Sequence, residues 1–373
     1  MVVVIRSNDV FSDPRAMKYV TYLQNNKIPY ILIGWDREGK LSSVDKKKGH
    51  FFERHAGFNV GGRKAVINRI YWMFYVLRTL YQIHAYNAVL HGCDLDSAFP
   101  AAVYKCLWSK KTSLIFDVFD WFSATLYNQS KFILSVFAQM EKFTVKRADK
   151  VIICEPERIE QIPYPITKDK LEVLPNIPFF KESSFLKYRD DCDFNNHLIT
   201  FAYVGGFYGE RCIPEIVEIA AEGRINLLIA GFGETSYVDR LHQLKDSPYI
   251  KYFGKVGYMD ALNIMYNADV IYAMYATSNP NHIYAAPNKF YESMFLGKPI
   301  FTTIGTIIEK KVCENQMGYT SGESMQEIIQ VINAITVIDL QEKGKKAHEL
   351  WLQKYQNYTQ KFMDEVYYPF ITS

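Results

Sequence analysis

Residues 287–303 read PNKFYESMFLGKPIFTT, a stretch that predicts a helix followed directly by a strand. A proline at the first helical position and a glycine just past the last one bracket a helix over residues 287–296. The apolar and β-branched run at residues 299–303 is typical of a short buried strand. Helices and strands that follow one another in this way build a parallel, doubly wound sheet.

Short apolar runs alternate with longer amphipathic segments along most of the chain. In the N-terminal half, strands are predicted at residues 2–5, 30–34, 88–91, 113–119, 150–154 and 171–174, and helices at 14–25, 63–83, 99–108 and 129–147. In the C-terminal half, strands at 198–204 and 226–230 and helices at 213–222 and 238–245 are followed by further segments at 250–253, 260–267 and 270–274. Residues 340–370 predict a long aromatic-rich helix. The fold class is therefore α/β.

The chain length of 373 residues favours two domains over a single core. The motif Pro175-Asn176-Ile177-Pro178 breaks the alternation, and the polar residues 180–197 predict a linker. We therefore expect two Rossmann-like doubly wound domains, at residues 1–185 and 186–345, that face a central cleft. Residues 346–373 are expected to form a helical tail that packs back on the N-terminal domain.

Charge is distributed unevenly between the two halves. Residues 1–185 carry 26 Lys and Arg against 18 Asp and Glu, whereas residues 186–373 carry 17 against 22. A basic half of this kind indicates an anionic partner, either a membrane face, a phosphorylated acceptor or an acidic glycan. An uneven spread of solvated charge is the alternative. No nucleic-acid partner is expected.

The cysteines and histidines do not predict a metal site or a disulfide scaffold. None of the six Cys residues forms a CxxC pair, and the eight His residues form no HExxH motif. The first residues, Met1 to Ile5, predict a buried strand rather than a secretion signal, and no transmembrane helix is expected. The sequence thus favours a reduced, cytoplasmic protein, with peripheral contact to the inner face of the plasma membrane as an option.

Three glycine-containing segments and one helix start are candidates for a phosphate site. The first strand is followed by Arg6-Ser7-Asn8-Asp9 without GxGxxG, which argues against a dinucleotide enzyme. The segment Gly205-Gly206-Phe207-Tyr208-Gly209-Glu210-Arg211 joins a strand to a helix, where glycines admit a ligand and an arginine neutralises a diphosphate. The segments 231–234 and 254–256 repeat the layout, although each is equally a plain turn.

The helix start at Pro287 presents free amides and the positive end of a helix dipole, which suit a diphosphate. Glu292 lies about one turn inside this helix, where its carboxylate could accept hydrogen bonds from both hydroxyls of a ribose. The alternative is a solvated glutamate on a helix surface.

Taken together, these features resemble the retaining GT-B glycosyltransferases of the family-four type over nearly the whole chain. The N-terminal motifs that carry the resemblance, in chain order, are Ser12-Asp13-Pro14-Arg15, His91-Gly92-Cys93-Asp94-Leu95-Asp96, Phe116-Asp117-Val118-Phe119-Asp120, Lys146-Arg147-Ala148-Asp149-Lys150-Val151-Ile152 and Leu174-Pro175-Asn176. The resemblance implies an N-terminal acceptor domain and a C-terminal domain for a nucleoside diphosphate sugar, with UDP favoured over GDP. It implies neither a metal nor a cofactor.

The resemblance also suggests roles for individual residues. Candidate catalytic residues are Arg211, Lys289 and Asp120; candidate donor-binding residues are Glu292, Asn288, Tyr284, Gly206, Gly233 and Val256; candidate acceptor-side residues are Asp94, Asp96 and Asn8. The chain departs from the family pattern at Tyr284, where a sugar-binding glutamate is common, and at Phe119, where a histidine is common. Acidic loop residues such as the three aspartates can equally cap helices.

The helix at residues 63–83 offers a further clue about the acceptor. Its predicted polar face contains Arg63, Lys64, Asn68, Arg78, Thr79 and Gln82, and its apolar remainder contains Ile67, Ile70, Trp72, Phe74, Leu77 and Leu80. A basic aromatic helix of this kind suits a membrane surface, and a core-packed helix with a wet basic edge is the alternative. The expected acceptor is a glycan, or a glycan linked to a lipid diphosphate, of a bacterial capsule or lipopolysaccharide. A non-catalytic GT-B subunit and a nucleotide-sugar epimerase or hydrolase are the competing interpretations.

Overall fold

The computed structural model describes residues 1–11, 13–56, 62–125, 130–178 and 188–373, together with the backbone but not the side chains of Gly62 and Arg63. Packing divides the chain into two compact units. Unit 1 comprises Met1–Pro175 and Thr359–Ser373, and unit 2 comprises Asn176–Tyr358. The domain boundary expected at residues 185 and 186 touches the stretch 179–187, which lies outside the described residues.

Unit 1 is built on a seven-stranded parallel sheet, sheet A, in the order β3-β2-β1-β4-β5-β6-β7. Its strands are β1 (Val2–Arg6), β2 (Tyr30–Trp35), β3 (Gly49–Phe52), β4 (Val89–Cys93), β5 (Ser113–Val118), β6 (Lys150–Ile153) and β7 (Leu171–Val173). The strand order reverses between β1 and β4, the switch point at which doubly wound sheets bind ligands.

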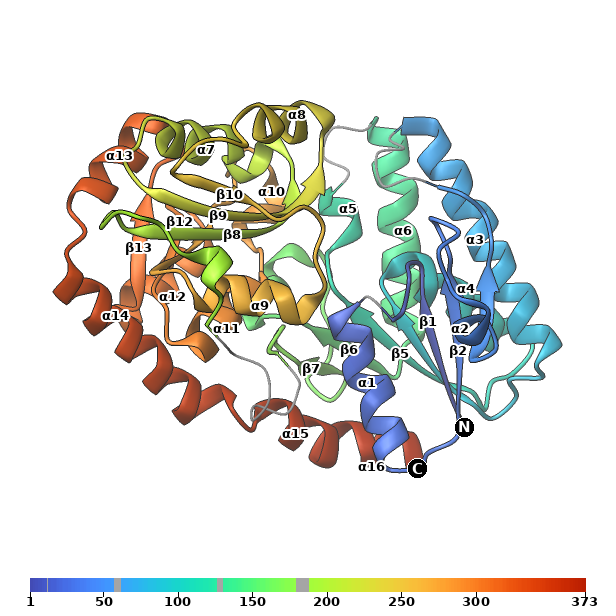
Figure 1. The fold of residues 1–373 in the computed structure, drawn as a ribbon. Helices are drawn as coiled ribbons and strands as arrows, with labels where there is room; N and C mark the ends of the chain where they lie inside the picture. The colour runs from blue at the N-terminus through green and yellow to red at the C-terminus, as the bar shows by residue number, and fades with distance from the viewer. Residues whose placement is uncertain (12, 57–61, 126–129, 179–187) are drawn as a thin grey trace. The chain divides into compact units, whose positions relative to one another are not determined.

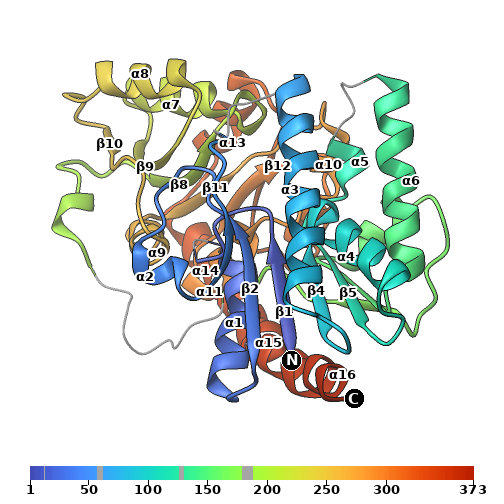
Figure 2. The ribbon, with the colours of Figure 1, turned by 90° about the vertical axis from the view of Figure 1, so that its right-hand side faces the viewer.

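The helices of unit 1 are α1 (Pro14–Asn25), α2 (Ser43–Lys46), α3 (Gly62–Gln82), α4 (Leu95–Leu107), α5 (Phe122–Thr125) and α6 (Lys131–Arg147). Residues of α3, α4 and α6 pack on the sheet face that carries Val3 and Ile5 (Figure 2). Trp35 of β2 stacks on Trp72 of α3 at a centroid distance of 5.8 Å. This aromatic contact fixes α3 against the sheet.

Unit 2 contains a six-stranded parallel sheet, sheet B, in the order β10-β9-β8-β11-β12-β13 (Figure 1). Its strands are β8 (Thr200–Phe207), β9 (Asn226–Gly233), β10 (Ile250–Tyr252), β11 (Val270–Ala273), β12 (Ile300–Thr303) and β13 (Gly318–Ser321). Its helices include α7 (Ile213–Ala221), α8 (Thr235–Gln243), α9 (Tyr258–Tyr266), α10 (Pro280–Ile283), α11 (Asn288–Leu296), α12 (Ile307–Asn315), α13 (Met325–Asn333) and α14 (Val337–Leu350). The switch point of this sheet lies between β8 and β11.

The last helices of the chain connect the two units in sequence. After α14, the helix continues through a π-helical turn at Trp351–Tyr355, α15 (Tyr358–Phe362), a second π-helical turn at Met363–Tyr367 and α16 (Tyr368–Thr372). In unit 1, the Tyr367 ring packs 5.0 Å from that of Tyr19 on α1, and its hydroxyl lies 3.1 Å from Nδ1 of the buried His91. The end of the chain is therefore part of the core of unit 1.

The structure corrects several predicted element boundaries. Helix α4 begins at Leu95 rather than at residue 99, because the Asp94 carbonyl already accepts a hydrogen bond from the Ala98 amide at 2.9 Å. Strand β3 and the elements α12, β13 and α13 were not predicted. Among the described residues, no helix combines the length and the apolar character needed to cross a bilayer.

Candidate active site

The glycines at the carboxyl ends of β8 and β9 lie within these strands, and not in the turns that the sequence predicts. Gly206 belongs to β8 and Gly233 to β9, and the two strands stay paired as far as Phe207 and Gly233. A Cβ atom on Gly233 would lie 2.1 Å from the carbonyl oxygen of Phe207, and one on Gly206 would lie 2.4 Å from the Tyr208 ring. Close approach of the neighbouring backbone therefore requires glycine at Gly233, whereas at Gly206 the Tyr208 side chain occupies the space that a Cβ atom would need.

Arg211 ends a short 3-10 turn, Gly209–Arg211, directly after β8. Its guanidinium carbon lies 4.0 Å from the centroid of the Tyr275 ring, a cation–π contact that orients the side chain. Its Nη1 atom is buried and has no hydrogen-bond partner among the described residues. A buried, unpaired guanidinium nitrogen is costly, which favours an anionic ligand at this point.

Lys289 lies in the first turn of α11, on the same side of unit 2 as the end of β8. Its Nζ atom lies 4.8 Å from the centroid of the Tyr203 ring and so close to Gly205 that an added Cβ would be 2.9 Å away. Burial lowers the pKa of Lys289, the charge of Glu292 opposes this shift and that of Arg211 adds to it, so that the pKa is about 8. The ammonium group is therefore poorly solvated and would gain from a nearby anion.

Glu292 is buried in α11 and is not a solvated helix glutamate, with 4% of its surface exposed. It accepts a side-chain hydrogen bond from the Tyr258 hydroxyl. Burial, the Glu292 charge and this hydrogen bond hold the pKa of Tyr258 well above its usual value, so Tyr258 remains a donor. A carboxylate has about four lone-pair sites and can accept more than one hydrogen bond.

The other predicted donor residues lie near α11 and α9. Asn288 is the exposed first residue of α11 and follows Pro287, which occupies the N-cap position. Tyr284 directly follows α10, and Val256 lies shortly before α9; both side chains are partly buried against the same core cluster of unit 2. Tyr284 and Asn288 are thus chain neighbours of Lys289, whereas Val256 shares only the core cluster with Tyr284.

Three tyrosines of this region were missed in the sequence analysis: Tyr203, Tyr258 and Tyr275. Tyr203 lies in β8 and Tyr275 lies two residues after β11, so both belong to the strands that flank the switch point of sheet B. The rule that ligands bind at carboxyl ends beside a switch point could have identified them. Tyr258 carries no comparable signal, since it is the first residue of a helix.

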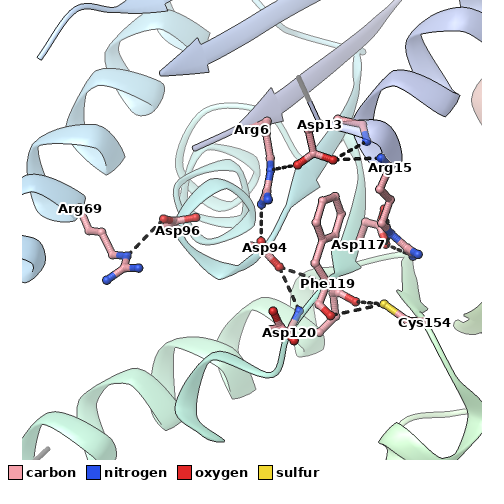
Figure 3. Close-up of polar contacts among 12 residues, drawn as sticks. Arg6, Asp13, Arg15, Arg69, Asp94, Asp96, Asp117, Phe119, Asp120 and Cys154 are labelled. Atoms are coloured by element: carbon pink, nitrogen blue, oxygen red, sulfur yellow. Dashed lines mark hydrogen bonds and ion pairs between the residues drawn. The ribbon is translucent and has the colours of Figure 1, made fainter. Parts of the chain in front are cut away.

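In unit 1, a network of charged groups occupies the switch point of sheet A (Figure 3). Arg6, at the end of β1, forms ion pairs with Asp13 at 2.7 Å and with Asp94, directly after β4. Asp94 also accepts a hydrogen bond of 2.9 Å from the Phe119 amide. Burial raises the pKa of Asp94 to about 6 even though the adjacent Arg6 favours its charged form.

Phe119 occupies the position at which the family commonly has a histidine. The guanidinium carbon of Arg6 lies 4.2 Å and that of Arg15 lies 5.1 Å from the centroid of its ring. Two cations at this distance would oppose protonation of an imidazole, whereas they are attracted to the face of a phenyl ring. Phenylalanine therefore suits this surrounding.

A second, fully buried network lies beneath the first. The Arg15 guanidinium donates three hydrogen bonds to Asp117, the shortest at 2.6 Å, and His91 Nε2 lies 3.6 Å from the same carboxylate. Burial alone would raise the pKa of Asp117, but Arg15 and His91 outweigh it and hold that pKa well below its usual value. His91, Cys93 and Asp117 bring potential metal ligands within 4.8 Å of one another. The Arg15 charge already neutralises this carboxylate, which disfavours a cation here.

The remaining predicted residues of unit 1 differ in their surroundings. Asp120 is largely exposed and forms an ion pair of 3.1 Å with Arg158. Asp96 is buried in the first turn of α4 and lies 3.5 Å from the Nε atom of Arg69. Asn8 is half-buried, and its carbonyl accepts a hydrogen bond from the Trp35 amide at 3.3 Å. The structure thus brings Asp94 into the charged network, with Asp96 and Asp120 near its edge.

The predicted division of α3 into polar and apolar faces is partly wrong. Thr79, assigned to the polar face, is buried, as are Trp72 and Leu80. In contrast, Ile67, Ile70 and Phe74 are 47%, 45% and 67% exposed. Packing against β2 and α4 buries the face with Trp72, so the face that remains outside carries apolar residues together with Lys64 and Arg78.

No protein-family model matches the chain, and no curated protein sequence matches it either. Solved structures do match. Sucrose-phosphate synthase from Thermosynechococcus elongatus superposes with a TM-score of 0.68 at 14% identity over 98% of this chain and 100% of that one. HepE from Anabaena, solved in complex with UDP-glucose, has a TM-score of 0.69 at 12% identity over 98% of both chains.

A UDP-N-acetylglucosamine 2-epimerase is also similar, with a TM-score of 0.62 at 12% identity over 99% of this chain and 96% of that one. At such identities, the likeness concerns the fold alone. Two parallel sheets of seven and six strands with helices on their faces, and superposition over almost the full length of these proteins, identify the fold as the two-domain α/β GT-B fold.

Proposed function

We propose that the chain is a retaining, metal-independent glycosyltransferase that uses a nucleoside diphosphate sugar, with UDP favoured over GDP. The observation that carries this proposal is the cluster of Arg211, Lys289 and Glu292 at the carboxyl end of sheet B, in which the buried Nη1 of Arg211 lacks a partner among the described residues. Two poorly solvated cations beside a buried carboxylate suit a diphosphate next to a ribose. The complexes of HepE with UDP-glucose, and with UDP and glucose, support the choice of nucleotide.

In this proposal, Arg211, Lys289 and the amides that begin α11 bind the diphosphate, and Glu292 accepts from the ribose hydroxyls. Asn288, Tyr284, Gly206, Gly233 and Val256 line the donor site. The positive groups stabilise the charge that develops on the β-phosphate as the bond between C1 of the sugar and the phosphate oxygen breaks. No resident cation is needed for that step.

The transfer itself needs no strong protein base. The acceptor oxygen forms a bond to C1 on the face from which the diphosphate departs, and the acceptor proton passes to a β-phosphate oxygen. The bonding electrons of the broken bond remain on that phosphate. Configuration at C1 is therefore retained. Asp94, Asp96, Asp120 and Asn8 are the groups that we assign to the acceptor side, with orientation of the hydroxyl as their role.

We propose that the acceptor is a glycan or a lipid-linked glycan of a cell-surface polysaccharide, reached by peripheral contact of α3 with the cytoplasmic face of a membrane. Ile67, Ile70 and Phe74 are exposed on α3, and Lys64 and Arg78 lie on the same outer face. Exposed apolar residues flanked by cations are typical of helices that lie at the surface of an anionic bilayer.

A nucleotide-sugar epimerase is the second candidate, favoured by the similarity to UDP-N-acetylglucosamine 2-epimerase. An epimerase would act on the sugar without an acceptor. Product analysis therefore separates the two candidates, because only a transferase requires a second substrate. A non-catalytic subunit would bind the nucleotide and release no product at all.

The test begins with thermal-shift measurements against UDP, GDP, ADP and CMP, followed by product analysis with sugars of the nucleotide that stabilises the chain most. We expect UDP to give the largest shift and turnover to persist in EDTA. Stabilisation by none of the four nucleotides would contradict the proposal. Turnover that stops in EDTA and returns with magnesium or manganese would contradict its metal-independent form.

A further inference from the structure

Three arginines lie near the carboxyl ends of β1 and β2 and on α3, and they differ in how their charges are balanced. Arg6 pairs with Asp13 and Asp94, and Arg69 lies 3.5 Å from Asp96 (Figure 3). Arg37, two residues after β2, takes part in no ion pair with any residue that the structure describes. Its Nε atom is buried and, within the described ranges, has no hydrogen-bond partner.

The surroundings of Arg37 make this lack of a partner costly. Its guanidinium carbon lies 4.4 Å from the centroid of the Trp35 ring, which removes one face from water. Burial lowers the pKa of Arg37, the charges of Asp96 and Asp94 oppose this shift and those of Arg69 and Arg6 add to it, so that the pKa is about 10. Both aspartates already balance other arginines. Arg37 is therefore a half-buried positive charge without a counter-ion of its own among the residues that the structure describes.

Asp96 contributes an unused acceptor to the same corner. Its side chain is 5% exposed, and while Oδ2 lies 3.5 Å from Arg69, Oδ1 is buried without a hydrogen-bond partner among the described residues. Arg69 is held over the Phe122 ring at 4.8 Å, and its Nε atom also lacks a hydrogen bond of normal length to the described part of the chain. Within the described ranges, donors of two arginines and an acceptor of one aspartate thus lack hydrogen-bond partners, and the charges of Arg69 and Asp96 both act on Arg37.

We propose that Arg37, Arg69 and Asp96 form a subsite for an anionic sugar, with a phosphate or carboxylate on the Arg37 guanidinium and an adjacent hydroxyl donating to Oδ1 of Asp96. A guanidinium binds both anions through paired N–H donors, and a hydroxyl beside the anion matches the unused carboxylate oxygen. A neutral sugar would leave the Arg37 charge unbalanced. The excess of basic residues in the N-terminal half also favours an anionic sugar over a neutral one.

This inference rests on the proposed function in one respect, since it takes the bound sugar to be the acceptor. It names the class of acceptor as a phosphorylated or carboxylated sugar. The same anionic group could belong to a soluble sugar or to a lipid headgroup, so the experiment includes both sources.

The test measures binding of glucose 6-phosphate, glucuronate and glucose to the full chain by ligand-observed NMR, with UDP present so that the donor site is filled. At least one anionic sugar should bind about tenfold or more tightly than glucose. Arg37→Gln should abolish this preference, and Arg37→Lys should retain part of it because the charge remains without the planar fork. Arg147→Gln is the matched control, since Arg147 also rests on an aromatic ring, Phe143, but is exposed.

The outcomes separate the subsite from the proposed function. Equal binding of charged and neutral sugars, or an unchanged preference in Arg37→Gln, would overturn the subsite. Inorganic phosphate that binds as tightly as glucose 6-phosphate would show an anion site without sugar recognition, which also overturns it. Loss of binding to phosphatidylglycerol vesicles in Arg37→Gln, with no sugar preference in the parent, would assign Arg37 to a lipid headgroup instead. UDP affinity should be the same in all variants. If the parent protein does not bind UDP, that result counts against the donor assignment and not against the subsite.

Discussion

Arg211 is held against Tyr275, with the guanidinium carbon 4.0 Å from the ring centroid, so that a residue of the turn after β8 is fixed beside the end of β11. These two strands flank the switch point of sheet B. A cation that is oriented before a ligand arrives loses little side-chain freedom when it binds. The buried Nη1 is the atom that this contact leaves available.

Arg211→Ala should therefore raise the activation barrier by roughly 2–4 kcal/mol, the scale for loss of one preorganised charge-stabilising group. The melting temperature should change little, since the side chain is partly exposed and belongs to a turn. Steady-state kinetics with the preferred donor measures the effect. Arg240→Ala is the matched control, because Arg240 pairs with Glu218 on the surface of the same unit. A normal rate in Arg211→Ala would move the diphosphate site elsewhere.

Lys289 predicts a pH dependence of nucleotide binding. Its pKa in the folded chain is about 8, lowered by burial, so the ammonium group loses its proton as the pH rises through about 8. A diphosphate binds the protonated form better; affinity should thus be steady below pH 7 and fall between pH 8 and 9.5, with proton uptake on binding in that range. Calorimetry in buffers of different ionisation enthalpy measures this uptake. Lys289→Arg should remove the pH dependence; a Lys289→Arg variant that keeps it would assign the titration to another group.

The α/β alternation and the helix at Pro287 could be predicted from the sequence because each rests on local patterns, whereas the strand order within each sheet was not predicted. Periodicity and terminal signals such as Gly297, which ends α11 with a φ of 65°, act within a few residues. The true ends of β8 and β9 could not be predicted. Glycine normally terminates a strand pattern, yet Gly231 and Gly233 continue β9 because the partner backbone approaches too closely for a Cβ atom.

The sequence offers candidate site residues only where a motif marks them. Glu292 and Lys289 lie in one short helix and share one motif. Arg37 and Arg69 are 32 positions apart in the chain, and no sequence pattern connects them. Their charges interact only in the folded unit, where α3 packs on sheet A. The burial of individual side chains on α3 could not be predicted from the sequence either. Thr79 resembles a residue of the polar face of α3, but packing turns it inward and leaves Phe74 outside.

The exposed face of α3 predicts a specific membrane variant. Ile70→Ser combined with Phe74→Ser should weaken binding to vesicles of phosphatidylglycerol and phosphatidylcholine by about tenfold or more, since two apolar side chains would no longer enter the bilayer. Nucleotide affinity should be unchanged. Co-sedimentation measures vesicle binding, and Ile338→Ser is the control, because Ile338 is 71% exposed in unit 2. If the parent protein does not bind these vesicles, the proposed peripheral contact with a membrane is wrong.

Glu141 predicts how stability depends on pH. It is buried in α6 and accepts a hydrogen bond of 2.9 Å from the Ser123 amide, and burial raises its pKa to about 7. Since the folded-state pKa exceeds the unfolded one, the contribution of Glu141 to stability is present below about pH 4.5 and is lost as the pH rises through 7. Glu141→Gln should therefore gain free energy of unfolding relative to the parent between pH 5 and 8, by up to roughly 3 kcal/mol. Urea denaturation at several pH values measures this, and a constant difference would show that Glu141 is charged throughout.

The strongest test of the donor site is Glu292→Gln. Tyr258 already donates to this side chain, so in the variant the single amide oxygen can serve Tyr258 and the NH₂ group is left to face the ribose. Loss of a charged acceptor should weaken UDP binding about ten- to a hundredfold, at 1.5–3 kcal/mol per such bond. Deoxy-UDP should bind the parent poorly and lose little more in Glu292→Gln, because the hydroxyl and its acceptor act as a pair. Tyr258→Phe keeps the carboxylate and should keep the preference for ribose. If Glu292→Gln binds both nucleotides as the parent does, Glu292 serves only Tyr258 and the core of α11.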